Sequence, residues 1–273
     1  CLDDRYRTTH TYTDAGHFQL TLQIRDEHGA VSAQSRKITI ASAPGEPNST
    51  ASSQIALDEA TNRAYTVNPD NNTVTAVDTN TETVLWEAQV GLHPMGIALG
   101  NDGYLWVPCR DADEIHVIDT LTGAQQALLP LNYGDAPVAI APIPDGSAML
   151  ISLEGSGELL RYDVATQTLN ATLPLGPTPR AIAVTHDGTR ALITRFLSGE
   201  HEGTLYDVDL AGSMSLTHTI GLARDHATDG SASGRGVPNY IAGIGISPDG
   251  DWAWVVAKKD NTIWCGYIRR ITT

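Results

Sequence analysis

The sequence predicts an all-β protein in which one four-stranded unit is repeated along the chain. A strand-ending aspartate recurs at intervals of 41, 44 and 46 residues, at Asp78, Asp119, Asp163 and Asp209. A second phrase keeps nearly the same interval: "PMGIALGNDG" from residue 94, "PVAIAPIPDG" from 137 and "PRAIAVTHDG" from 179, with a looser copy, "IAGIGISPDG", from 241. Each unit also holds four short β-prone runs separated by Asn, Asp, Gly and Pro turns.

The length of the unit predicts a β-propeller, because four strands in about 40 to 45 residues are typical of one propeller blade. A twisted sheet of this size cannot cover its own faces, so each blade must pack against a neighbour. In the first complete copy the strands are "SQIAL", "RAYTV", "TVTAVD" and "TVLWEAQV". The small apolar runs at 96–99, 139–142 and 181–184 suit innermost strands covered on both faces. We expect residues 54–273 to form four complete blades and part of a fifth.

The run "AYTVNPDNNTVTAVDTNTETV", followed by "PMGIALGNDG", resembles the YVTN-type repeat of bacterial and archaeal β-propellers. This resemblance covers residues 53–264. It implies a secreted or surface-layer protein, and it implies that a whole propeller has seven blades. By that measure the propeller in this chain is incomplete.

The segment before the propeller has a different pattern. Apolar residues alternate at Phe18, Leu20, Leu22 and Ile24, a turn is expected at "RDEHGA", and apolar residues resume at Ile38 and Ile40. Residues 1–41 are similar to the C-terminal half of a PKD-type domain, which implies a partial immunoglobulin-like β-sandwich. The Pro, Gly and Ser content of residues 42–53 predicts a linker.

The end of the chain, "DNTIWCGYIRRITT", departs from the repeat. Tyr267 stands where the strand-ending aspartate is expected. We interpret this as an irregular blade or as a truncated or shifted sequence.

The composition excludes several function classes. The net charge of −15 disfavours nucleic acid and anionic membrane surfaces, and no basic patch offsets it. Three cysteines, with no Cys-x-x-Cys-His motif, are too few for a disulfide framework and exclude attached c-type haem within this chain; whether Cys109 and Cys265 pair stays open. No apolar run has the length of a membrane span. Because the chain begins at Cys1, a signal peptide is either absent or lies upstream.

The recurring aspartates have a structural interpretation. An aspartate followed by Thr or Ala at a strand end accepts hydrogen bonds from turn amides. The Asp-Gly pairs at Asp102, Asp145, Asp187 and Asp249 predict hairpin turns between the first two strands of each blade. We expect these residues to specify the fold and not a reaction.

The repeat lengthens in its fourth copy, where the Asp-Gly spacing rises to 62 residues. The extra residues lie mainly in 222–240, and a shorter excursion lies at 196–203. Loops on a rigid β scaffold commonly carry binding groups. His201, His226, Asp225 and Asp229 are chemically able to bind a metal, but their spacing matches no zinc or calcium motif, so a metal role stays open. No nucleophile motif is present.

Arg180 stands where other copies have Met95 and Val138, so a charged group replaces apolar ones near the propeller axis. One explanation is an anionic ligand, which arginine can hold with two parallel hydrogen bonds. The other is an ion pair with a neighbouring acid. The predicted ligand-binding set is Arg180, Arg195, His201, Arg224, His226 and Arg235.

These patterns favour a non-catalytic, extracytoplasmic propeller module that binds a protein or a small anionic ligand. We expect it to belong to a larger secreted, cell-surface or periplasmic protein, because PKD-type modules commonly serve as extracellular spacers, and we expect no cofactor in this chain. Two alternatives stay open. "SGRGVPNY", "ISPDGDWAWV" and "TRFLSGEHEG" resemble propellers that accompany a dihaem peroxidase-like domain, which implies an accessory propeller whose haem lies outside this chain. The other alternative is a propeller hydrolase or lactonase with polar loops at the channel mouth.

Overall fold

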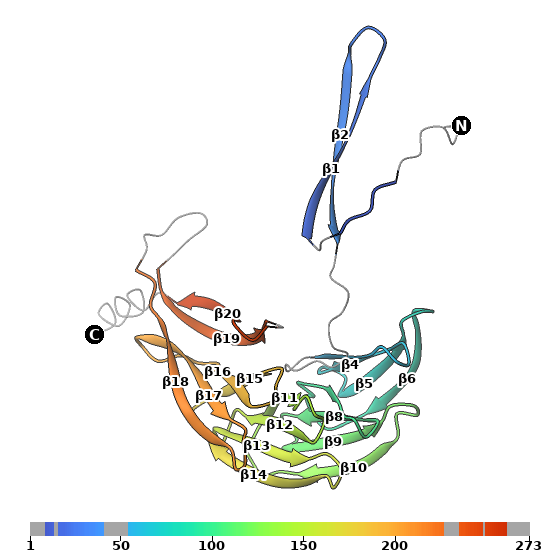
Figure 1. Cartoon of the computed structure of the whole chain (residues 1–273). Coiled ribbons are helices and arrows are strands. Elements are labelled where there is room, and N and C mark those ends of the chain that lie inside the picture. Colours follow the sequence, from blue (N-terminus) through green and yellow to red (C-terminus); the bar gives the residue numbers. More distant parts are fainter. Residues whose placement is uncertain (1–8, 14–15, 41–53, 227–234, 248, 261–273) are drawn as a thin grey trace, which may run out of the picture. The chain divides into compact units, whose positions relative to one another are not determined.

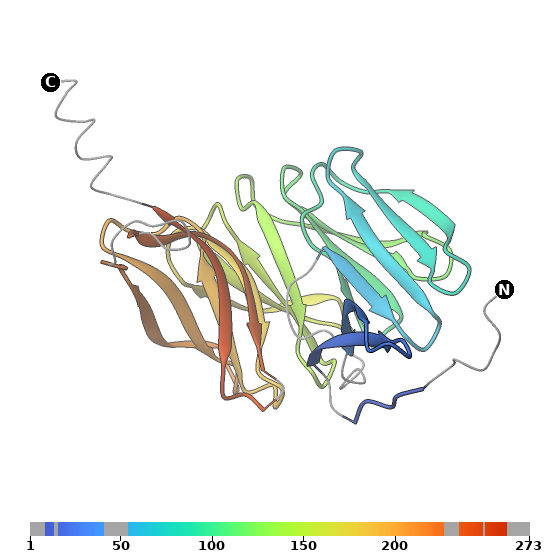
Figure 2. The ribbon, with the colours of Figure 1, turned by 90° about the horizontal axis from the view of Figure 1, so that it is seen from above.

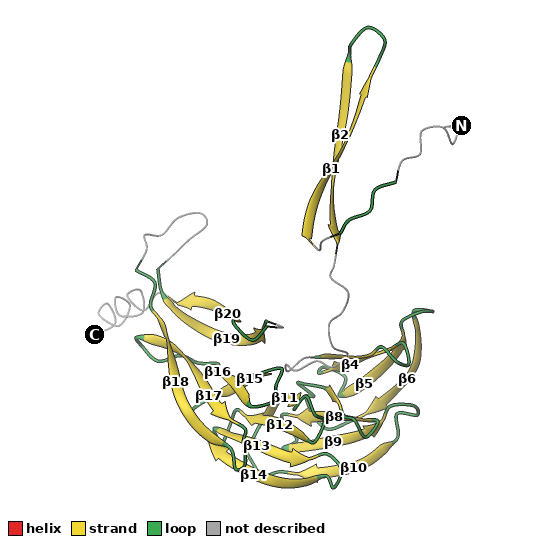
Figure 3. Ribbon diagram, viewed as in Figure 1, coloured by secondary structure: helices red, strands yellow, loops and turns green. Residues whose placement is uncertain are grey.

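The computed structural model describes residues 9–13, 16–40, 54–226, 235–247 and 249–260, and every regular element in these residues is a β-strand (Figure 3). The described part of the chain therefore offers no helix with the length and apolar character to cross a bilayer. The chain divides into two compact units, Cys1–Pro47 and Asn48–Thr273. The predicted linker at 42–53 lies outside the described residues.

The first unit contains one antiparallel hairpin, β1 (Gly16–Arg25) and β2 (Val31–Ile40). The turn between them forms where the sequence predicts it, because the Asp26 carboxylate accepts hydrogen bonds from the amides of His28 and Ala30. Leu20, Leu22 and Ile24 alternate along β1 and are about half exposed or more. This apolar stripe is thus uncovered by the described residues.

The second unit contains four antiparallel four-stranded sheets and one hairpin (Figure 1). The first blade has β3 (Ile55–Asp58), β4 (Arg63–Asn68), β5 (Thr73–Asp78) and β6 (Thr83–Gln89). The second has β7 (Ala98–Leu99), β8 (Tyr104–Cys109), β9 (Glu114–Asp119) and β10 (Gln125–Pro130). The third has β11 (Pro137–Pro142), β12 (Ala148–Leu153), β13 (Glu158–Asp163) and β14 (Thr168–Pro174). The fourth has β15 (Pro179–Val184), β16 (Arg190–Arg195), β17 (Glu202–Asp209) and β18 (Ser215–Ala223), and the hairpin has β19 (Val237–Ile246) and β20 (Ala253–Asp260).

This order confirms the predicted fold class of four complete blades and part of a fifth. The first strands of successive blades, β3, β7, β11, β15 and β19, contact one another in turn, whereas β6, β10, β14 and β18 follow the outside of the arc (Figure 1). The predicted innermost runs are therefore innermost. Residues 261–273, including Tyr267 and Cys265, lie outside the described residues.

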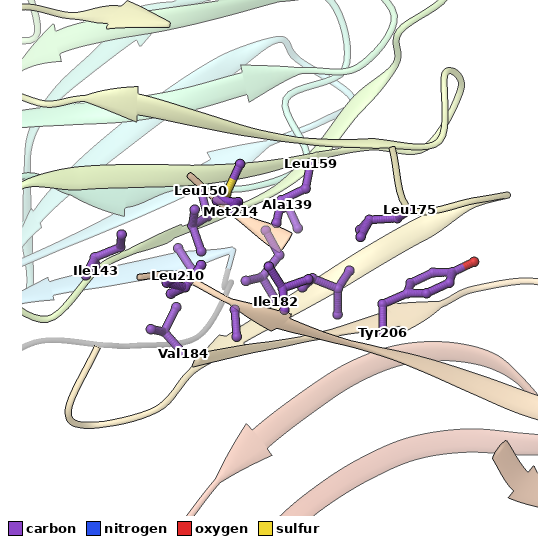
Figure 4. Close-up of a cluster of buried hydrophobic side chains, with 14 of the residues drawn as sticks. Ala139, Ile143, Leu150, Leu159, Leu175, Ile182, Val184, Tyr206, Leu210 and Met214 are labelled. Carbon is purple, nitrogen blue, oxygen red and sulfur yellow. The ribbon is translucent and has the colours of Figure 1, made fainter. Parts of the chain in front are cut away.

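The hydrophobic core lies between blades and not within them. One cluster joins the third and fourth blades, where Leu150 and Leu159 face Ile182 and Tyr206 (Figure 4). In β11, Ile140 packs toward the second blade while Ala139 and Ala141 pack toward the fourth. Both faces of a middle blade are thus buried, which explains why its strands show little polar alternation.

Because neighbouring strands of each blade are antiparallel, the strand ends lie at two opposite rims of the propeller unit. The strands of successive blades run from one rim to the other (Figure 2). We call one the turn rim, because it carries the turns from first to second strand and from third to fourth strand. The other is the entry rim, where each innermost strand begins and where second strands connect to third strands. Backbone hydrogen bonds join the connections of each rim, as from Val164 N to Ser147 O at the turn rim and from Glu154 N to Ala136 O at the entry rim.

The turn rim confirms the structural interpretation of the recurring aspartates. Oδ1 of the strand-ending aspartate accepts an amide two or three residues later in each blade, at Asp78, Asp119, Asp163 and Asp209. Oδ1 of each Asp-Gly aspartate likewise accepts the second amide after it, at Asp102, Asp145, Asp187 and Asp249. The following glycine has positive φ, for example 72° at Gly146, a conformation that favours glycine.

Adjacent blades are also tied together at the turn rim through backbone carbonyls. Thr120 O of the second blade accepts three donors from the first blade, Arg63 Nη1 at 3.0 Å, Trp86 Nε1 at 3.2 Å and Tyr65 OH at 3.4 Å. Arg161 Nη1 of the third blade donates in the same way to Leu210 O of the fourth, at 3.0 Å.

Candidate functional site

A cavity of about 210 Å³ opens at the entry rim, where the innermost strands begin. Each of the five blades supplies part of its wall, and the lining residues are Gln54, Met95, Gly96, Val138, Ala139, Arg180, Ala181 and Ala242. Among the described lining residues, Arg180 is the only charged one. The other described residues of the lining are apolar apart from the amide of Gln54, so they add no further charge to the space that the Arg180 guanidinium borders.

Arg180 is held from two sides. Its Nη1 donates to Oε2 of Glu154 in the third blade at 2.9 Å, and its guanidinium carbon lies 4.0 Å from the centre of the Phe196 ring. The Arg180 side chain is 22% exposed and that of Glu154 is 13% exposed. The ion pair with a neighbouring acid, which the sequence left as one explanation of Arg180, is present. A guanidinium has five N–H donors, so this pair leaves most of them for other acceptors.

Charged contacts continue from Glu154 into the second blade. Arg110 Nη2 lies 3.8 Å from Glu154 Oε1, and Arg110 Nη1 donates to Asp111 Oδ1 at 2.9 Å. His93 Nδ1 lies 3.0 Å from the other oxygen of Asp111. Burial opposes ionisation of Asp111, but the hydrogen bonds from His93 and Arg110 prevail and lower its pKa.

Aromatic contacts continue from Arg180 into the fifth blade. The rings of Phe196 and Tyr240 meet edge to face, with centres 5.6 Å apart, and Lys258 Nζ lies 5.5 Å from the Tyr240 ring centre. We call the whole set the rim network; its members are His93, Asp111, Arg110, Glu154, Arg180, Phe196, Tyr240 and Lys258. The network crosses the second to fifth blades beside the cavity.

A repeated backbone feature positions the cavity lining. The residue before each innermost phrase has positive φ, with values of 56°, 49°, 51° and 51° at His93, Ala136, Thr178 and Tyr240. We call this the kink position. In three blades its carbonyl accepts the amide that follows the second strand, from Arg110, Glu154 and Phe196. The residue two places further on lines the cavity in each case, at Met95, Val138, Arg180 and Ala242.

The 196–203 excursion is fastened to the start of β19. Ser198 donates its amide to Asn239 Oδ1 at 2.8 Å and its hydroxyl to Pro238 O at 2.6 Å. Thr194 Oγ1 donates to Ile241 O at 2.8 Å, and the Ile241 amide donates to Phe196 O at 3.2 Å. These bonds fix Phe196 against Tyr240. Sequence reasoning selected this loop for its charged residues and missed its aromatic one.

The predicted ligand-binding residues fall into two groups along the entry rim. Arg180 lines the cavity, and Arg195 lies on the neighbouring strand, opposite Pro179. His201 lies between β16 and β17, Arg224 and His226 follow β18, and Arg235 precedes β19. A backbone bridge between Asp225 and Gly236 draws the last three together, and Lys259 pairs with Asp225. None of these four lines the cavity.

Two arginines of the set retain unused hydrogen-bonding capacity. The Nε atoms of Arg195 and Arg224 are buried and have no hydrogen-bond partner among the described residues. Arg195 lies close enough to Tyr206 to affect the pKa of its hydroxyl, which burial raises and the positive charge of Arg195 lowers. Arg195 is therefore the candidate source of additional positive charge near Arg180.

The described residues hold no group of three or more His, Cys, Asp or Glu side chains placed to bind a metal ion. Asp229, one of the chemically suitable ligands, lies outside them. Cys109 is buried as a free thiol, and burial raises its pKa to about 12, so it remains protonated and unreactive at neutral pH. Cys265, its candidate disulfide partner in the sequence, lies outside the described residues.

Comparison with protein-family models and with curated protein sequences finds no match. Solved structures do match. Hydrazine synthase from Kuenenia stuttgartiensis aligns with a TM-score of 0.63 and 18% identity over 74% of this chain and 54% of that one. Virginiamycin B lyase from Staphylococcus aureus aligns with a TM-score of 0.56 and 16% identity, over 89% and 68% of the two chains.

A 6-phosphogluconolactonase-like protein from Bacteroides uniformis aligns with a TM-score of 0.59 and 13% identity, over 90% and 75% of the chains. The match to hydrazine synthase covers about half the length of the hydrazine synthase chain. At such identities the likeness shows the fold alone, and the fold is a β-propeller.

Proposed function

We propose that the propeller unit is a non-catalytic binding module whose entry-rim cavity takes a small ligand that carries a carboxylate or a similar anion. The observation that carries this proposal is the placement of Arg180. Its guanidinium borders a cavity whose other described lining residues are uncharged. A small apolar pocket with one precisely aimed charge suits a ligand with an anionic group and an apolar body.

The charges around Arg180 decide whether an anion can be accepted. Glu154 neutralises part of Arg180, but this carboxylate also faces Arg110. Arg195, on the adjacent strand, has no ion pair among the described residues and adds positive charge. In a chain of net charge −15, Arg110, Arg180 and Arg195 bring positive charge to this stretch of the rim and so reduce the repulsion that an anion meets there.

A carboxylate can bind Arg180 without displacing Glu154, since Arg180 keeps further N–H donors. The outer group of Arg224, His226 and Arg235 lies away from the cavity lining. We propose that this group contacts a protein partner or a larger ligand instead.

The extracytoplasmic placement is part of the same proposal. It is supported by the likeness of residues 1–41 to a PKD-type module and of residues 53–264 to YVTN-type repeats. The hairpin β1–β2, with its alternating apolar stripe, is consistent with the last strands of an immunoglobulin-like sandwich. A longer secreted, cell-surface or periplasmic protein is the setting that these features favour.

A propeller hydrolase or lactonase is the second candidate, because all three of the similar structures described above bear enzyme names, one of them a lactonase. Among the described lining residues, only Gln54 and Arg180 have polar side chains, and neither is a general base at neutral pH. This favours binding over hydrolysis. The accessory propeller of a haem-containing redox enzyme remains a third proposal, whose haem domain lies outside this chain.

Calorimetric titration of the full chain with hexanoate and with its uncharged analogue hexanamide tests the binding function. We expect hexanoate to bind, hexanamide to bind at least about tenfold more weakly, and Arg180→Met to remove that difference. Arg235→Met asks whether the outer group contributes. Arg63→Met, at the turn rim, is the control and should leave affinity unchanged.

Melting temperatures of the same variants separate a binding role from a structural one. Lost binding with an unchanged melting temperature supports the proposal. If Arg180→Met lowers the melting temperature and leaves hexanoate affinity intact, Arg180 is structural and the proposed site is wrong. Release of product from a lactone or ester by the full chain would favour the hydrolase.

A further inference from the structure

The kink position presents one side chain per blade at the entry rim, directly before the cavity lining. His93, Ala136, Thr178 and Tyr240 occupy it in the second to fifth blades. The four residues share a positive φ of 49° to 56° and differ in the side chain that they display. Such a position is suited to setting ligand preference without changing the scaffold.

Three of the four side chains have little to offer a ligand. His93 is engaged by Asp111, and Ala136 has no functional group. Thr178 Oγ1 accepts a hydrogen bond from the Leu197 amide at 3.1 Å. Tyr240 differs, because it is 43% exposed and its hydroxyl makes no hydrogen bond in the described part of the chain.

Tyr240 is held firmly despite its exposure. Its own amide donates to Asn239 Oδ1 at 2.9 Å, and the same oxygen accepts the Ser198 amide from the fastened loop. Its ring meets the Phe196 ring edge to face, and Lys258 Nζ lies 5.5 Å from its centre. A rigid aromatic ring with open surface provides stacking at little entropic cost.

We propose that Tyr240 is the specificity-determining residue of the entry-rim cavity and that the ligand is a small aromatic carboxylate. This inference rests on the proposed anion-binding function of the same site. The carboxylate meets Arg180, and the ring of the ligand lies against the exposed surface of Tyr240 beside Phe196. Tyr240 is not itself among the described lining residues, but Ala242, two residues later on the same strand, is one of them.

The charge distribution suits such a ligand. Arg180 lies against the Phe196 ring and Lys258 lies near the Tyr240 ring, so each ring of the aromatic pair has a cation beside it. The carboxylate of a bound aromatic acid therefore has a cation nearby in either orientation of the ligand. An aliphatic acid can use Arg180 equally well but cannot make the ring contact. The preference should therefore come from Tyr240 and the affinity for the anion from Arg180.

The test compares three monocarboxylates by calorimetry with the full chain: 3-phenylpropanoate, 3-cyclohexylpropanoate and hexanoate. We expect 3-phenylpropanoate to bind about three- to tenfold more tightly than either non-aromatic acid. Tyr240→Asn should abolish this preference by weakening 3-phenylpropanoate binding about three- to tenfold more than it weakens hexanoate binding. Asparagine is chosen because it tolerates positive φ and so keeps the kink.

Tyr133→Asn is the matched control, since Tyr133 is a fully exposed tyrosine on the same rim without a ring contact. It should leave all three affinities unchanged. Equal binding of the three acids, or a preference that survives in Tyr240→Asn, overturns the inference and leaves the anion site standing. If none of the acids binds the full chain, the proposed function fails and the inference fails with it. Tyr240→Gly, which also accepts positive φ, repeats the test should the asparagine variant fold poorly.

Discussion

The two rims of the propeller unit use carboxylates in different ways. At the turn rim, aspartates such as Asp78 and Asp187 accept amides of their own turns, a few residues away in sequence. At the entry rim, Asp113 also accepts backbone amides, those of Gly134 and Ala136, but Glu154 and Asp111 accept basic side chains, and Glu154 does so from two other blades. The turn-rim aspartates thus stabilise individual blades, whereas the ion pairs of Glu154 and Asp111 lie beside the cavity that we propose binds a ligand.

The pKa values express the same contrast. Hydrogen bonds within the turns lower the pKa of most turn-rim aspartates, by the Thr81 amide at Asp78 and by the Thr122 hydroxyl at Asp119. The Thr185 hydroxyl lowers that of Asp187 to about 2. These acids are already satisfied and ionised at neutral pH, so the dense negative charge of the turn rim is structural. A binding role is better sought where the basic groups gather.

Acid should produce the largest effect, because it acts on the whole turn rim together. The affected aspartates are Asp78, Asp119, Asp145, Asp163, Asp187 and Asp249, all with lowered pKa. A carboxylate with a lowered folded pKa stabilises the fold above its unfolded pKa, and this contribution is lost as pH falls through the folded value. The melting temperature should therefore fall between about pH 4 and pH 2.

Asp102 acts in the opposite direction, because burial raises its pKa and protonation then favours the folded state. It should offset a small part of the loss. Thermal melts at several pH values check the prediction. A melting temperature that stays constant down to pH 2 would mean that the turn hydrogen bonds do not depend on ionised carboxylates.

The next largest effect is expected at Arg190, where the contrast between the rims breaks down. Near the turn rim, Arg190 forms a two-point ion pair with Asp207 across neighbouring strands, and the Asp207 side chain is only 3% exposed. Arg190→Met leaves a buried carboxylate without its main partner. Since Arg190 itself is 55% exposed, water can replace part of the lost interaction, and we expect a cost of about 1–2 kcal/mol in the free energy of unfolding.

Urea denaturation of Arg190→Met measures this cost, and the double variant with Asp207→Leu provides the control. Removal of both charges should recover most of the stability, because no unpaired carboxylate then remains. A double variant no more stable than Arg190→Met would show that packing of the arginine stem, and not its charge, matters here.

The smallest effect on stability, and the most informative one on binding, is expected from Glu154→Gln. The variant keeps the shape and a hydrogen-bond acceptor but removes the charge shared by Arg110 and Arg180. We expect a loss of about 1 kcal/mol in unfolding free energy and a gain in hexanoate affinity, because Arg180 is no longer neutralised. Denaturation and calorimetry on one protein sample measure both. A loss of affinity together with stability would mean that Glu154 positions Arg180 for the ligand.

The aspartate turns of the turn rim could be predicted from the sequence because their hydrogen bonds join near neighbours. Asp-Gly pairs and strand-ending aspartates indicate their own turns, and the repeat then fixes which run is innermost. The rim network could not be read in this way. Glu154, Phe196 and Tyr240 meet only after three blades have packed, and no local pattern marks them.

Arg180 stands out in the sequence because it breaks the repeat, and an ion pair with a neighbouring acid is one of the two explanations that the sequence allows for it. Tyr240 aligns with His93, Ala136 and Thr178 in the repeated phrase. Its proposed role in ligand preference depends on a positive φ, and the residue types at this position, which differ from blade to blade, do not predict that φ. The ligand-binding role of the whole predicted set, from Arg180 to Arg235, remains a prediction.

The three donors that converge on Thr120 O imply an order of assembly for the first two blades. Arg63, Tyr65 and Trp86 come from two strands of the first blade, while their common acceptor lies in the turn between β9 and β10. The first blade can complete these bonds only after that later-encoded turn has formed. A chain emerging from the ribosome would thus hold its first blade unfinished until the second had been synthesised, so the pair should gain protection from hydrogen exchange as one step.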